Sequence, residues 1–177
     1  MRCKWCNLDN PVYVKYHDEE WGVLNLDEHY LFEMLILESF QAGLSWECVL
    51  NKRDAFRKAY DNFDIEKVIK YDDEKPEKLI NNENIIRNKL KIKASINNAK
   101  IFKSISLEYN GFKNYLLKYF KEYPICEVSK TTSSISDNIS SDLKKRGMKF
   151  VGSVIIYSYL QAIGLINSHE NDCFMKN

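Results

Sequence analysis

The carboxyl group of Glu38 is the first candidate for chemistry in this sequence, because it follows an apolar run. Residues 31–37 read Leu-Phe-Glu-Met-Leu-Ile-Leu, and helical spacing places Leu31, Leu35 and Glu38 near one face. A carboxylate that points into an apolar face is costly to bury, so it usually has a partner or a function. An ion-paired or half-exposed glutamate at a helix end is the alternative, and this feature alone does not choose between them.

Aromatic side chains gather in the same third of the chain, including all three tryptophans, Trp5, Trp21 and Trp46. Tyr13 and Tyr16 alternate with polar residues, which favours faces that line a cavity, although aromatic clusters most often form plain core. The π-faces of such rings attract positive charge, and a carboxylate accepts a hydrogen bond from an exocyclic N–H group. The combination predicts a pocket for a planar, cationic heterocycle.

Candidate metal ligands lie at both ends of the chain. His169 and Cys173 are spaced i, i+4, so a single helical turn would direct both toward one ion. Cys3 and His17 would complete a closed Cys2His2 set, which suits one structural zinc ion that ties the termini together. Cys6 forms a rival Cys-x-x-Cys pair with Cys3, and the two thiolates would join His169 and Cys173 instead.

A third group of residues could bind phosphate. Residues 79–93 read as two short helices around a tight polar turn, which can expose backbone N–H groups at a helix N-terminus. Residues 87–100 hold no acidic side chain and five basic ones: Arg87, Lys89, Lys91, Lys93 and Lys100. These features suit a DNA phosphate, and a solvated lysine-rich face fits them equally well.

The elements that position these groups are predicted to be helices nearly throughout. With 45% hydrophobic residues, six Gly and three Pro in 177 residues, the composition favours one helical domain over a loop-rich β protein. Asp27, Ser45 and Asp64 are predicted N-caps. Helices are predicted over residues 28–38, 45–60, 64–69, 75–80, 85–102, 112–120 and, as a central buried helix, 151–165. The polar segment 130–141 is predicted to be a surface loop.

Charge and cysteine content narrow the class of protein. The net charge of +1 gives no evidence for nucleic acid by itself. No stretch approaches a membrane span, and residues 1–20 lack the apolar core of a signal peptide. The five scattered cysteines fit a reducing cytoplasm, with free or metal-bound thiols. We expect a cytoplasmic, monomeric protein without a membrane partner.

Strings of residues along the whole chain, in the same order, resemble the bacterial 3-methyladenine DNA glycosylase I family. They lie at residues 11–13, 16–22, 31–34, 37–38, 41–46, 143–147, 149–152, 157–158, 161–162, 164–165 and 169–173. The resemblance implies an all-α helix-hairpin-helix DNA-repair fold. One domain would span residues 1–177, with the hairpin at about 77–100 and a zinc lobe formed by residues 1–25 and 150–177. Such an enzyme would flip 3-methyladenine out of alkylated double-stranded DNA and release it as the free base.

The resemblance also implies a role for individual residues. The base pocket falls on Glu38, Tyr16 and Trp46, with Tyr13, Trp5 and Trp21 beside it. The zinc ligands fall on Cys3, His17, His169 and Cys173, with Cys6 as the second choice to Cys3. DNA-binding residues are Gln41, Gly43, Leu44, Ile85, Arg87, Lys89 and Lys91. The side chain of Leu44 is the candidate wedge that fills the gap left by an extruded base.

Two positions depart from the family pattern. Asn84 stands where the hairpin turn usually has glycine, and Phe40 stands where a polar residue is more usual. Asparagine tolerates positive φ better than most residues, so a turn remains feasible.

The expected mechanism needs little acid catalysis, because a 3-methylated adenine in DNA is cationic. Residues 94–121 contain a single acid, Glu108, so the catalytic aspartate of the wider superfamily is missing, as in this family. Glu38 would bond the edge of the base, and water rather than a protein amine would attack the sugar. A non-catalytic lesion binder, a zinc hydrolase with an open metal position and a small nucleoside hydrolase remain as alternatives.

Overall fold

A computed structural model describes residues 1–176, and this part of the chain is mostly helical, as predicted. Its helical elements are α1 (Pro11–Glu19), α2 (Glu28–Gln41), α3 (Trp46–Leu50), α4 (Arg53–Ala59), η1 (Asp61–Phe63), α5 (Ile65–Val68), α6 (Glu74–Ile80), α7 (Lys89–Glu108), α8 (Phe112–Leu117), α9 (Ser134–Lys145) and α10 (Ser153–Ala162). Two short strands, β1 (Ile125–Cys126) and β2 (Ile166–Asn167), pair in parallel and add a small sheet to the expected all-α fold.

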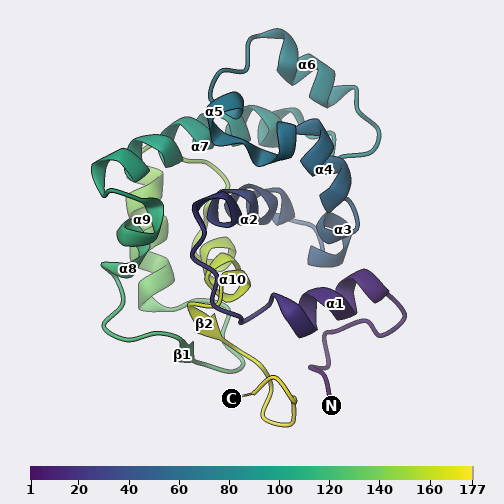
Figure 1. The fold of residues 1–177 in the computed structure, drawn as a ribbon, viewed down its shortest axis with the longest axis vertical. Coiled ribbons are helices and arrows are strands. Elements are labelled where there is room, and N and C mark those ends of the chain that lie inside the picture. The colour runs from purple at the N-terminus through teal and green to yellow at the C-terminus, as the bar shows by residue number, and fades with distance from the viewer. Residues whose placement is uncertain (177) are drawn as a thin grey trace.

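Helices α2 and α10 pack together at the centre of the molecule (Figure 1). Residues 31–40 of α2 are all buried, including the charged side chains of Glu33 and Glu38 among the apolar ones. Helix α10 confirms the predicted buried helix in type, although it is shorter than residues 151–165. Both chain ends lie at one edge of the molecule, where the backbone N–H of Phe174 donates to the carbonyl of Met1 at 2.9 Å.

Several predicted element boundaries were wrong. The segment 45–60 forms two helices, α3 and α4, which are separated at Asn51 and Lys52. The helix predicted to begin at residue 85 begins at Lys89, because the side chain of Asn88 caps it by accepting two backbone N–H bonds.

The polar segment 130–141 was predicted to be a loop, and most of it belongs to helix α9. The side chains and backbones of Ser133 and Ser136 form a capping box at its start. Ile139 and Leu143 are buried one turn apart, and α9 packs against α10. The many serines hide this spacing in the sequence.

Helix α1 was not predicted at all. The side chain of Asn10 caps it, and Pro11 occupies its first position, where a missing N–H group costs nothing. This helix buries Tyr16 and His17 on adjacent positions. It therefore brings a pocket residue and a metal-ligand candidate into one element.

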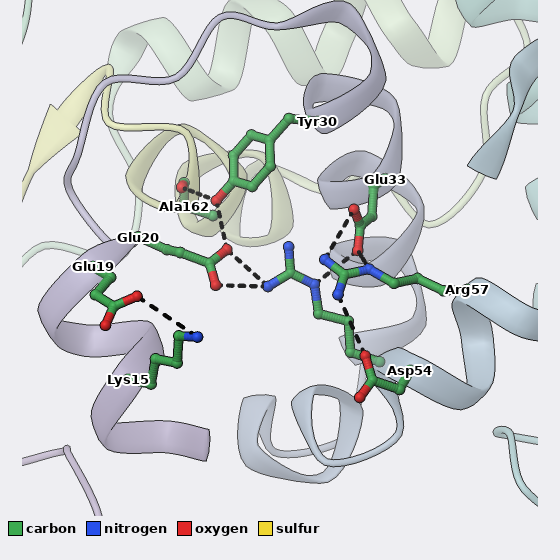
Figure 2. Close-up of polar contacts among 9 residues, drawn as sticks. Lys15, Glu19, Glu20, Tyr30, Glu33, Asp54, Arg57 and Ala162 are labelled. Atoms are coloured by element: carbon green, nitrogen blue, oxygen red, sulfur yellow. Dashed lines mark hydrogen bonds and ion pairs between the residues drawn. The ribbon is translucent and has the colours of Figure 1, made fainter. Parts of the chain in front are cut away.

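A buried ion network joins α1, α2 and α4 (Figure 2). The guanidinium of Arg53 donates to both carboxylate oxygens of Glu20, at 2.9 and 2.7 Å, and to one of Glu33 at 2.7 Å. Arg57 donates to Glu33 at 2.8 Å. The hydroxyl of Tyr30 donates to Glu20 and to a backbone carbonyl near the end of α10. The network fixes α1 relative to the two central helices.

Among the described residues, no helix has the length and apolar character needed to cross a membrane.

Candidate functional site

A cavity of about 370 Å³ opens between α1, the end of α2 and the C-terminal third of the chain. Its lining residues are Trp5, Tyr13, Tyr16, Trp21, Glu38, Gln41, Trp46, Val128, Ser129, Lys130, Ser158, Gln161, Ser168 and Glu170. The six residues predicted to surround a base therefore lie together in one cavity, with Gln41 beside them.

Glu38 lies in the last turns of α2 and is only 2% exposed. One of its carboxyl oxygens, Oε2, has no hydrogen-bond partner within the described part of the chain. Burial raises the pKa of Glu38 well above its ordinary value, because a carboxylate there is poorly solvated. The predicted inward-pointing carboxyl group is confirmed, and the ion-paired alternative is wrong.

Aromatic rings form the walls of the cavity. The ring centroids of Tyr16 and Trp46 are 5.4 Å apart, and Trp5 packs edge-on against Tyr13 and Trp21. Burial of its hydroxyl group raises the pKa of Tyr16 well above the ordinary value. The site thus combines flat aromatic walls with the buried carboxyl group of Glu38, which is the arrangement that suits a planar cationic ring.

Other polar atoms around the cavity are also buried without a partner in residues 1–176. They are Gln41 Oε1, Trp46 Nε1 and Ser168 Oγ. Buried polar atoms are rarely left unpaired in a folded protein, so these atoms mark positions where a bound molecule would complete hydrogen bonds.

The lining residues from the C-terminal third of the chain were not predicted from the sequence. Ser158 and Gln161 lie on α10 one turn apart, and Ser168 and Glu170 follow β2. The i, i+3 spacing of Ser158 and Gln161 in a largely apolar helix could have indicated that both side chains face one polar cavity.

A second buried cluster brings together four potential metal ligands, Cys3, His17, His169 and Cys173. Their ligand atoms all lie within 4.8 Å of one another. Cys6 lies outside this group, and its sulfur faces the carbonyl of Tyr13 at 4.0 Å. The cluster could hold a metal ion with Cys3 rather than Cys6.

Side-chain oxygens next to this cluster orient both imidazole rings. His17 Nδ1 lies 2.8 Å from a carboxylate oxygen of Asp18, and His169 Nδ1 lies 2.8 Å from the side-chain oxygen of Asn167. These contacts leave each Nε2 to face the cluster, and His169 Nε2 has no partner among the described residues. The predicted helical turn from His169 to Cys173 was wrong, because this segment consists of non-helical turns. The chain ends meet in space, and that proximity assembles the ligands.

The turn that follows α2 holds three of the predicted DNA-binding residues. Gly43 has φ +79°, and a Cβ added there would meet no described atom within 4 Å. The side chain of Leu44 is 41% exposed although it is apolar. Gln41 lines the cavity, so the turn joins the cavity to the surface.

The residues predicted at the hairpin divide into two groups. Arg87 and Lys89 are exposed at the surface, whereas Ile85 is 3% and Lys91 is 7% exposed. The ammonium group of Lys91 points inward, and we therefore leave it out of the candidate DNA surface. Asn84 is not among the residues with positive φ, so the turn does not use the conformation for which glycine is favoured.

Within the described residues, a helical frame surrounds a buried carboxyl group among aromatic walls, and this arrangement suits a flat, electron-poor ring. The chain belongs to the methyladenine glycosylase family, whose model matches residues 5–176. It is 42% identical to DNA-3-methyladenine glycosylase 1 of Escherichia coli (strain K12), over 97% of this chain and 95% of that protein.

Solved structures of related proteins have the same fold. A crystal structure of 3-methyladenine DNA glycosylase I superposes with a TM-score of 0.94 at 39% identity, covering 99% of both chains. A structure concerned with 3-methyladenine recognition by the glycosylase of Staphylococcus aureus gives a TM-score of 0.94 at 34% identity, covering 99% of this chain and 96% of that one.

Proposed function

We propose that the protein excises 3-methyladenine from alkylated double-stranded DNA by hydrolysis of the N-glycosidic bond. The observation that carries this proposal is the buried Glu38 carboxyl group at an aromatic pocket, with one oxygen that has no hydrogen-bond partner in residues 1–176. The names of the related enzymes support the same substrate.

In the proposed mechanism, the damaged base leaves the duplex and enters the pocket, where it stacks against the rings of Tyr16 and Trp46. The ionised Glu38 accepts a hydrogen bond from the edge of the cationic base and offsets its charge. Neutral adenine gains less from both interactions, and this difference provides selectivity. Water forms the new bond to the sugar carbon, the electrons of the glycosidic bond go to the base, and the water loses a proton to solvent.

We propose that the reaction stops at the abasic site, without strand cleavage. Lys130 is the one lysine among the lining residues, and its ammonium lies 2.8 Å from a carboxylate oxygen of Glu127. An ion-paired, protonated amine is a poor nucleophile.

DNA would bind across the turn after α2 and the hairpin formed by α6, the residues 81–88 and the start of α7. This segment corresponds to the helix-hairpin-helix of about residues 77–100 within a single domain. The exposed Arg87 and Lys89 would contact phosphate, as would backbone groups near Ile85. Leu44 would occupy the gap left by the extruded base.

We also propose that Cys3, His17, His169 and Cys173 hold one zinc ion with a structural role. Two thiolates and two imidazoles with fixed tautomers suit tetrahedral zinc, and the closed set offers no place for a catalytic water. We further propose that the protein acts as a monomer.

The proposal is tested by incubating the protein with methylated duplex DNA and identifying released bases by chromatography. We expect 3-methyladenine in the supernatant and abasic sites that break only after alkali. Binding without release would instead indicate a lesion binder. Immediate inhibition by a chelator without unfolding would indicate a zinc hydrolase, and cleavage of free methylated nucleosides would indicate a nucleoside hydrolase.

A further inference from the structure

Lys91 is a basic residue of α7 whose ammonium group points into the protein. Its Nζ donates hydrogen bonds to the backbone carbonyl oxygens of Phe40, at 2.8 Å, and Ala42, at 2.5 Å. Burial lowers the pKa of Lys91. Carbonyl oxygens can only accept hydrogen bonds, so the Lys91 amine is the donor in both short bonds. The sequence grouped Lys91 with its neighbours Lys89 and Lys93, which are exposed.

The two carbonyl groups belong to the end of α2 and the turn after it. The last carbonyls of a helix have no partner within the helix, and the helix dipole adds partial negative charge there. A buried cation that bonds two of them is therefore complementary in both charge and geometry. The same turn carries Gln41, which lines the pocket, and the exposed Leu44.

Helix α7 begins at Lys89, so Lys91 lies in its first turn, directly after the hairpin. The side chain thus connects the candidate phosphate-binding segment to the candidate wedge across 49–51 residues of sequence. No other hydrogen bond in the described residues joins α7 to the turn at residues 41–44.

We propose that Lys91 is a positioning residue, which fixes the position of the Gln41–Leu44 turn relative to the candidate DNA-binding hairpin. The inference rests on the proposed function, since it assumes that the turn enters the duplex. It differs from a phosphate contact, because the ammonium group donates its hydrogen bonds to backbone carbonyl oxygens inside the protein.

The experiment compares Lys91→Met with Lys89→Met, a matched change two residues away on the surface. For Lys91→Met we expect excision from duplex DNA to fall about tenfold to a hundredfold, because the wedge is misplaced. Excision from single strands and fluorescence binding of free 3-methyladenine should change little. The slope of log affinity for duplex against log salt should equal that of wild type. Lys89→Met should lower the slope by about 0.9, and low salt should restore its affinity.

Two outcomes contradict the positioning role. If Lys91→Met lowers the salt slope as Lys89→Met does, Lys91 neutralises a phosphate. If it weakens duplex excision, single-strand excision and free-base binding equally, its effect is general destabilisation.

A second measurement applies even if Lys91→Met does not fold. Wild-type protein is acetylated with and without duplex DNA, and the modified lysines are identified by mass spectrometry. Lys91 should react slowly in both samples, whereas Lys89 and Lys93 should react rapidly and be protected by DNA. Rapid reaction of Lys91 in the free protein, with protection by DNA, would overturn the inference. Failure of wild type to release 3-methyladenine would overturn the proposed function instead, and the labelling of Lys91 would be unaffected.

Discussion

At the scale of single residues, the buried carboxyl group of Glu38 makes the stability of the folded protein depend on pH. Burial raises the pKa of Glu38 in the folded state above its ordinary value of 4.5. The folded protein therefore holds the proton more tightly than the unfolded chain. This contribution to stability is complete below pH 4.5 and is lost as the pH rises through the folded-state pKa.

Glu38→Gln should consequently gain stability relative to wild type as the pH rises from about 4.5. The amide has the same shape and does not ionise. Thermal melts of both proteins between acid and neutral pH measure the difference. A difference in melting temperature that is constant over this range would show that Glu38 titrates as an ordinary carboxyl group.

A second prediction for a single residue concerns Leu44, whose apolar side chain is exposed. Leu44→Ala should reduce excision from duplex DNA more than from single strands, because only a duplex has a gap to fill. Leu107→Ala is the matched control, since Leu107 is an exposed leucine near the far end of α7. Equal losses on both substrates would exclude a wedge role for Leu44.

At the scale of elements, the ion network of Arg53 fixes α1 against α2 and α4. Arg53→Met would leave Glu33, which is 3% exposed, with only Arg57 as a partner. Removal of one member of a buried ion pair costs about 3–5 kcal/mol. Urea unfolding measures this loss, and adding Glu20→Gln and Glu33→Gln should recover much of it. A loss below about 1 kcal/mol would mean that the network behaves like exposed ion pairs.

Local signals predicted some elements well and others poorly. The caps at Asp27, Ser45 and Asp64 are confirmed, because a cap depends on residues within one turn. The side-chain direction of Lys91 depends on carbonyl groups about fifty residues away, and nothing local separates it from Lys89. The lining residues near Ser168 could not be placed for the same reason.

At the scale of the whole molecule, the four potential metal ligands lie where the two chain ends meet. Cys173→Ser should lower zinc content and melting temperature together, because structural metal binding contributes folding free energy. For a chain of this size, each kcal/mol lost lowers the melting temperature by about 2–4 °C. Cys6→Ser is the matched control, since Cys6 is buried nearby but lies outside the cluster. Zinc that is retained in Cys173→Ser and lost in Cys6→Ser would show that the proposed ligand set is wrong.

The pocket itself is also a property of the whole chain. Its walls come from α1, the end of α2, α10 and the segments around β1 and β2. The N-terminal residues of the pocket could be predicted because all of them lie within residues 5–46 and match the family pattern there. Its shape could not, since it depends on how distant segments pack.

The central claim is that the Glu38 carboxylate recognises 3-methyladenine through a charge-assisted hydrogen bond to the edge of the base. Glu38→Gln keeps the shape of the side chain, removes its negative charge and turns part of the acceptor into a donor. Losing one charge-assisted hydrogen bond costs about 1.5–3 kcal/mol, which is about one to two powers of ten in affinity.

The most direct measurement is a pair of titrations, with free 3-methyladenine and with adenine, monitored by tryptophan fluorescence in wild type and Glu38→Gln. We predict that the mutant loses about tenfold to a hundredfold in affinity for 3-methyladenine, while its affinity for adenine changes much less. A mutant that binds 3-methyladenine as tightly as wild type would contradict the claim and leave Glu38 as a structural residue.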